Sequence, residues 1–190
     1  MKVGRRKSEP GISLLELTVT LAILALMAAV AVPHLASSDP EKAGLAAEQV
    51  AGALRFARGE ALRRGVETGV MVDHDDSDAS VGEVVVYRVD TTVTPFGRAE
   101  ILRNPLSKQF YDFNVSGNAL TDAALLNTTG AFDCEGVGRR RDVQFNIRGT
   151  PVCLDGNTRH RLLTSEIPVG AGGAVATVHL DPVTGRVEVH

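Results

Sequence analysis

The sequence predicts an α+β protein in which a long N-terminal helix packs on antiparallel β-sheets. The 190-residue chain begins with a long apolar run and continues with a second segment of helical periodicity. From residue 66 the pattern changes to short alternating runs separated by turn residues. This length fits one domain together with an anchoring segment.

The apolar run extends from Ile12 to Val32 and contains one charged residue, Glu16. A helix of this length would be about 31 Å long, which matches the hydrocarbon core of a bilayer. Four basic residues precede the run: Lys2, Arg5, Arg6 and Lys7. By the positive-inside rule they predict a cytoplasmic N-terminus and place the rest of the chain across the membrane.

Three interpretations of this run compete. An ordinary secretory signal peptide could be cleaved at Ala29-Val30-Ala31, but its apolar stretch is usually shorter and holds no acid. A plain membrane anchor explains the length and gives no reason for Glu16. An acid deep in a bilayer costs about 2.5–3.5 kcal/mol on insertion scales, so it indicates a function.

The third interpretation explains the acid. Gly11 followed by Ile12, with Glu16 as the fifth residue from Ile12, resembles the class III signal of type IV pilins and type II secretion pseudopilins. The resemblance implies that a prepilin peptidase cleaves between Gly11 and Ile12 and methylates the new amine. It also implies that this amine pairs with Glu16 of a neighbouring subunit. Pro33 lies where such pilins commonly carry a helix-loosening proline, whereas Ile12 departs from the commoner phenylalanine.

A second helix is predicted after the turn-like "SSDP". Asp39 or Ser38 with Pro40 is a start signal, and Gly65 is a stop signal. Apolar residues recur at spacings of three and four and line one face: Ala43, Ala47, Val50, Leu54, Ala57 and Ala61. This helix is expected to continue the anchor as a stalk that packs on the globular core.

Strands are predicted from Val66 onward. The candidates are "VETGVMVD", "EVVVYRVD", "RAEILR", "RDVQFNIRG", "TPVCLD", "RLLTS", "AVATVHL" and "GRVEVH". The last two are separated by "DPVTG" and predict a closing hairpin. Residues 104–140 show no strong period, so we expect an irregular excursion with one short helix.

Three stretches narrow the resemblance: "ARGEALRRGVETGVMV", "VQFNIRGTPV" and "DPVTGRVEV". They are similar to the GspH/FimT subgroup of minor pseudopilins, in which a long helix packs against two antiparallel sheets. The implied organisation is a leader at 1–11, a transmembrane helix at 12–32, its periplasmic continuation at 33–65 and a β-rich domain at 66–190.

Two cysteines, Cys134 and Cys153, fit one disulfide if the domain lies in an oxidising compartment. Such a bond would stabilise the fold by roughly 3 kcal/mol in the chain-entropy model. Two unrelated buried thiols are the alternative. Zinc is not expected, since there is no CxxC pair and the five histidines lack ligand spacing.

Charge and motifs argue against other chemistry. Beyond residue 11 the chain carries 16 bases and 22 acids, and this net negative charge disfavours general nucleic-acid binding. The acids Asp73, Asp75, Asp76 and Asp78 lack the glycine and glutamate of a calcium loop, so we expect a solvated hairpin tip. The basic run Gly138 to Arg141 is expected to be a solvated loop. No catalytic motif is present, so neither an enzyme nor a cofactor is expected.

The sequence therefore predicts a minor pseudopilin of a type II secretion system, held in the bacterial inner membrane and then assembled into a periplasmic pseudopilus. Its expected partners are prepilin peptidase, other pseudopilins and the assembly platform. One alternative is a FimT/FimU-like minor pilin of a type IV pilus that acts in pilus assembly or DNA uptake, with Arg186 as the candidate contact. Another is a secreted enzyme released by ordinary signal cleavage.

Overall fold

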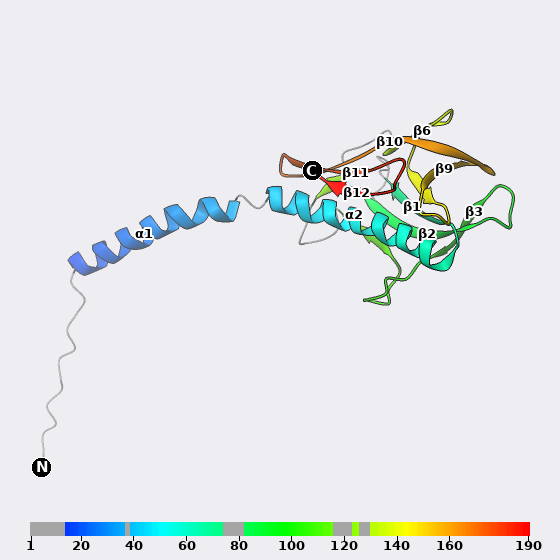
Figure 1. The fold of residues 1–190 in the computed structure, drawn as a ribbon. Coiled ribbons are helices and arrows are strands. Elements are labelled where there is room, and N and C mark those ends of the chain that lie inside the picture. Colours follow the sequence, from blue (N-terminus) through cyan, green and yellow to red (C-terminus); the bar gives the residue numbers. More distant parts are fainter. Residues whose placement is uncertain (1–13, 37–38, 74–81, 116–122, 126–129) are drawn as a thin grey trace, which may run out of the picture. The chain divides into compact units, whose positions relative to one another are not determined.

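The computed structural model describes residues 14–36, 39–73, 82–115, 123–125 and 130–190 (Figure 1). The chain divides into two compact units, residues 1–38 and residues 39–190. We describe each unit by itself.

The first unit contains helix α1 (Leu14–Ala36), which is 23 residues long. The helix continues through Pro33 for three further residues, although a proline inside a helix removes one backbone hydrogen bond. Within the parts of the chain that the structure describes, no helix combines the length and the apolarity required to cross a membrane.

The second unit begins with helix α2 (Asp39–Arg64). Its start and end agree with the predicted signals: Asp39 opens the first turn, and Gly65 follows the last turn with a positive φ of 65°. Seven of its ten buried residues are alanines, and these small side chains let the helix lie close to the sheet. The strands that the helix contacts include β1, β2, β8, β10, β11 and β12.

The strands form one antiparallel network (Figure 1). They are β1 (Thr68–Asp73), β2 (Glu83–Asp90), β3 (Gly97–Ile101), β4 (Asp112–Asn114), β5 (Ala124–Leu125), β6 (Phe132–Cys134), β7 (Gly138–Arg140), β8 (Asp142–Phe145), β9 (Pro151–Asp155), β10 (Thr158–Ala171), β11 (Ala174–Leu180) and β12 (Val187–Val189). The main order is β12-β11-β10-β9-β8-β1-β2-β3, with β4 beside β2, β5 and β6 beside β10, and β7 beside β6. The predicted α+β class, a helix packed on antiparallel strands, is confirmed.

The long strand β10 connects two parts of this network. Its first residues pair with β9, with His160 opposite Cys153, and its last residues pair with β11, with Val169 opposite Ala176. The two sheets implied by the family resemblance are therefore joined through one strand. The sequence indicated only "RLLTS" of β10, because polar residues and Pro168 interrupt the apolar alternation further along.

The irregular excursion expected at residues 104–140 needs correction in its described part, whereas residues 116–122 and 126–129, where the short helix was expected, lie outside the described residues. The described part of this region contains four short strands, β4 to β7, and no helix. Each strand has only two or three residues, too few to show a period in the sequence. Each forms beside a partner strand: β4 pairs with β2, β5 and β6 pair with β10, and β7 pairs with β6.

Candidate functional site

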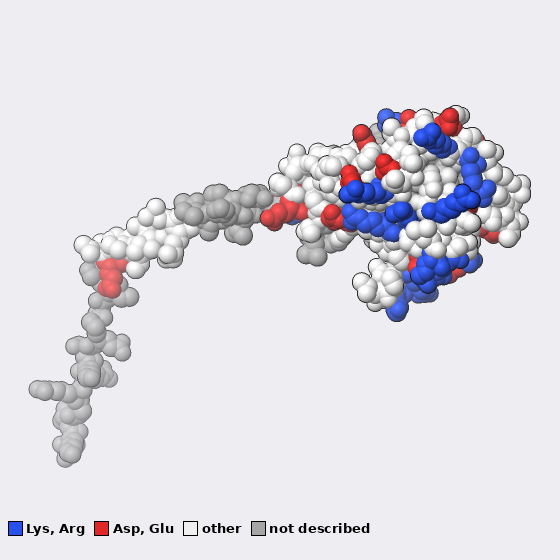
Figure 2. All heavy atoms as spheres, in the orientation of Figure 1, with Lys and Arg blue, Asp and Glu red and all other residues white. Residues whose placement is uncertain are grey.

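The described part of helix α1, residues 14–27, presents apolar side chains around the helix. Leu14 is 81% exposed, Leu24 is 62% exposed and Met27 is 65% exposed. The other large apolar residues of its described part are also about half exposed or more: Leu15, Leu17, Val19, Leu21, Ile23 and Leu26. Figure 2 shows this part as white spheres apart from acidic atoms near its beginning. Continuous apolar surface on this scale indicates an interaction surface.

Glu16 lies in the first turn of α1, where the positive end of the helix dipole favours a carboxylate. The hydroxyls of Thr18 and Thr20 donate to the carbonyl oxygens of Leu15 and Leu17, each at 2.9 Å. Within residues 14–27, Glu16 is thus the only polar side chain without a partner. It is exposed and available to a cation from another chain.

Two other residues of the predicted signal, Gly11 and Ile12, lie outside the described residues. Pro33 lies within α1, in a part whose side chains the structure does not describe. A pair between Glu16 and an Ile12 amine joins two subunits, so the geometry of one chain does not test it. These roles remain predictions.

A joint between α2 and two turns, made by Arg58, Gly149 and Gly185, holds the helix on the sheet domain. The Nε of Arg58 donates to the carbonyl oxygen of Gly149 at 3.2 Å. A Cβ added at Gly149 would lie 3.1 Å from the side chain of Leu62, and one added at Gly185 would lie 2.6 Å from the Gly149 oxygen. Both glycines have positive φ, 74° and 68°. Only glycine fits these two contacts and this backbone conformation without strain.

The two turns are built alike. The Oδ1 of Asn146 accepts the backbone N–H of Arg148 at 2.9 Å and of Thr150 at 3.1 Å. The Oδ1 of Asp181 accepts the backbone N–H and the hydroxyl of Thr184, at 2.6 Å and 2.8 Å. These hydrogen bonds hold the pKa of Asp181 below its usual value. Each turn is thus a side-chain-nucleated loop that ends in a glycine.

The three stretches that carried the family resemblance meet at this joint. Arg58 comes from "ARGEALRRG", Gly149 from "NIRGTPV" and Gly185 from "DPVTGRV". The sequence indicated the stretches but not their meeting, because the partners lie 91 positions apart and no local period reports such a contact. The motif residues therefore have a structural role in holding α2 on the sheets.

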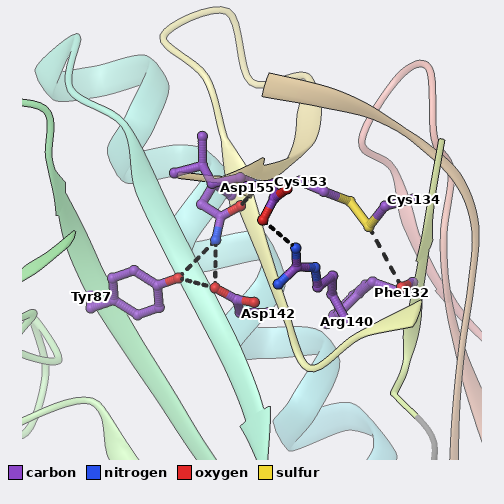
Figure 3. The surroundings of a disulfide bond; sticks show 9 residues. Tyr87, Phe132, Cys134, Arg140, Asp142, Cys153 and Asp155 are labelled. Carbon is purple, nitrogen blue, oxygen red and sulfur yellow. Dashed lines mark hydrogen bonds and ion pairs between the residues drawn. A yellow bond between two sulfur atoms is a disulfide. The ribbon is translucent and has the colours of Figure 1, made fainter. Parts of the chain in front are cut away.

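The expected disulfide is present: Cys134 of β6 is bonded to Cys153 of β9, and both are buried (Figure 3). It joins two strands that pair with successive parts of β10, β9 with Thr158–Arg161 and β6 with Leu162–Ser165. Beside it, the Nη2 of Arg140 lies 2.6 Å from the Oδ1 of Asp155. The basic run is therefore not a free loop, since residues 138–140 form β7 and Arg140 has an ion-pair partner.

A polar network lies on the neighbouring strands (Figure 3). The Tyr87 hydroxyl donates to the Oδ2 of Asp142 at 2.9 Å, and the Nε2 of Gln144 donates to both groups at 2.9 Å and 2.7 Å. Burial, with the nearby Asp142 charge, raises the pKa of Tyr87 well above its usual value. The groups satisfy one another, so the network is structural.

Arg186, the candidate nucleic-acid contact, is 76% exposed but has an acidic partner. Its Nε lies 3.0 Å from the Oε1 of Glu188, and the same carboxylate lies 3.6 Å from the Nε2 of His190. Glu188 therefore offsets the positive charge of Arg186, which a nucleic-acid phosphate would need for binding. Among the described residues no cluster of three or more acidic, histidine or cysteine side chains could hold a metal, and Asp75, Asp76 and Asp78 lie outside those residues.

An exposed apolar helix followed by a helix packed on antiparallel strands defines a pilin-type structural subunit. The family profile described as Type II transport protein GspH matches residues 46–165, and the chain belongs to this family. The chain is also similar to the crystal structure of the type IV minor pilin FimU of Pseudomonas aeruginosa strain PAO1. That match has 13% identity and a TM-score of 0.45, and covers 79% of this chain and 89% of the other. No curated protein matches the chain.

Proposed function

We propose that this chain is a minor pseudopilin of a type II secretion pseudopilus that is assembled from the inner membrane and helps to drive protein export. Residues 12–32 span the membrane before assembly, and the domain after Pro33 lies in the periplasm. The observation that carries the proposal is the contrast within α1, where exposed apolar residues on every side surround one unpartnered acid, Glu16. The disulfide supports the periplasmic location, because that compartment is oxidising.

In this proposal prepilin peptidase removes residues 1–11 and methylates the amine of Ile12. The amine of one subunit pairs with Glu16 of the next, while the apolar surface of α1 is buried among the helices of other pseudopilins. An unpaired carboxylate in such an apolar environment is costly, so a subunit docks favourably where the amine meets it. The sheet domain then faces outward, and the assembly platform extracts the chain from the membrane.

Mass spectrometry of the mature protein tests the processing step. The proposal predicts a chain that begins at N-methylated Ile12 and retains the apolar helix. A Gly11→Asp variant should retain residues 1–11, since the peptidase requires the glycine. A mature chain that begins after Ala31 would instead identify an ordinary secretory signal and overturn the proposal.

Deletion of the chain tests which filament it serves. The proposal predicts lost export of secreted proteins with surface piliation intact, restored by the full-length chain. Lost piliation with export intact would contradict the assignment to a secretion pseudopilus.

A further inference from the structure

A groove of about 370 Å³ lies on the sheet domain beside the joint. It is lined by the start of β9, the start of β10 and the turn between β11 and β12. Its apolar lining includes Val152, Pro182 and Val183, and the side chain of Val183 is 61% exposed.

Two arginines of β10 give the groove a positive charge. Arg161 is exposed, and within the described part of the chain no acidic partner lies beside it. Arg159 uses its Nε for Glu67, at 2.8 Å, and its guanidinium lies over the ring of Phe96. The groove thus retains one unpaired cation and a second that is only partly satisfied.

The unpaired Arg161 contrasts with arginines elsewhere in the domain that are paired with acids. The chain beyond residue 11 is acidic, and many other arginines of the domain are neutralised by neighbours, as Arg140 is by Asp155 and Arg186 by Glu188. Figure 2 shows that basic side chains gather on the domain beyond the first turns of α2. A ligand that fits the groove therefore carries negative charge, together with apolar groups for Val183 and Pro182.

We propose that this groove binds an acidic, extended segment of a neighbouring pilin-type subunit, which rests on the proposed function. An Asp or Glu of that segment pairs with Arg161, and an adjacent apolar side chain lies against Val183. A polypeptide is favoured over nucleic acid, because a polyanion would meet the net negative charge of the chain beyond residue 11. Through this contact the sheet domain helps to select which subunit lies next to it in the filament, and it does so separately from α1.

Site-specific photocrosslinking in cells that produce the full-length chain and its filament partners tests this docking. The photoreactive residue p-benzoylphenylalanine is placed at Val183 in the groove or, as an assembly control, at Leu17 on α1. We expect the Val183 probe to crosslink to an Asp- or Glu-containing peptide of a pilin-type subunit, identified by mass spectrometry. Arg161→Glu should lower this yield about fivefold and Arg161→Gln somewhat less, the scale of an exposed ion pair.

Arg103→Glu is the matched control, since it makes the same charge change at an arginine that stacks on Phe110 away from the groove. It should leave the Val183 yield unchanged. Crosslinks from Leu17 without any from Val183 would overturn the docking and leave the proposed function intact. Crosslinks from neither position would overturn both. A nucleic-acid product, a peptide without acids or a yield unchanged by Arg161→Glu would overturn the docking alone.

Discussion

The two helices of this chain have similar lengths and opposite surfaces. In the described part of α1 the leucines and isoleucine are exposed, whereas in α2 most apolar residues lie on one buried face and most charges lie elsewhere. Helix α2 obtains its burial from the strands of its own chain. In the proposed function, lipid and then other subunits cover the apolar surface of α1. The comparison teaches that α2 belongs to the fold, whereas we propose that α1 belongs to the assembly.

The largest expected effect compares one leucine from each helix. Leu54 of α2 is fully buried, so Leu54→Ala should cost about 2–5 kcal/mol of the domain's free energy of unfolding. Leu24→Ala in α1 should change it by less than about 0.5 kcal/mol, because Leu24 is exposed. Denaturant unfolding of the full-length chain in detergent, followed by tyrosine fluorescence, measures both. Equal losses would contradict the division between the two helices.

The joint predicts an intermediate effect. Gly185→Ala places a methyl group against the backbone oxygen of Gly149, at a position whose positive φ disfavours alanine. It should therefore lower the domain's free energy of unfolding by about 2–4 kcal/mol. Gly136→Ala is the matched control, because Gly136 has a φ of 73° but open space around its Cβ. Gly136→Ala should lower the free energy of unfolding by about 1–2 kcal/mol, which is the cost of the backbone strain alone. The same denaturant curves measure the difference, and equal losses would show that the close contact with Gly149 is unimportant.

The smallest expected effect is a pH dependence of the sheet domain. Hydrogen bonds from Thr184 lower the pKa of Asp181 in the folded state, and those from Thr92 lower the pKa of Asp90. The stability from each acid is present above the unfolded pKa of about 4 and is lost as pH falls through the lower folded pKa. Asp181→Asn should flatten the decline of the denaturation midpoint below about pH 4. An unchanged slope in this variant would contradict the assigned cause.

The sequence predicted well what depends on neighbours along the chain. The face from Ala43 to Ala61 was found from its spacing, and the bounds of β2 and β11 agree with their alternating runs. The long β10 was mostly missed, since Pro168 and polar residues interrupt its pattern while pairing to β11 holds it extended. The short strands β4 to β7 depend on partner edges, which no local pattern contains.

The residues of the candidate site also divide into those that the local sequence reveals and those that depend on the fold. Glu16 stood out because one acid in an apolar run is a local anomaly that needs no fold to detect. The joint of Arg58, Gly149 and Gly185 did not, because it exists only after α2, β9 and β12 are in place. The resemblance indicated its three stretches without saying that they meet. The groove beside Arg161 is likewise a product of tertiary structure.

Assembly of Glu16 variants tests most directly whether α1 is held by other subunits. The measurement is the fraction of the chain recovered in sheared pseudopili from cells that overproduce the filament. We predict that Glu16→Ala lowers this fraction about tenfold or more, the loss of one charge-assisted pair of at least about 1.4 kcal/mol. Glu48→Ala, which removes an exposed acid from α2, should leave it unchanged. Recovery of Glu16→Ala at the level of the original chain would contradict the assignment of α1 to the assembly.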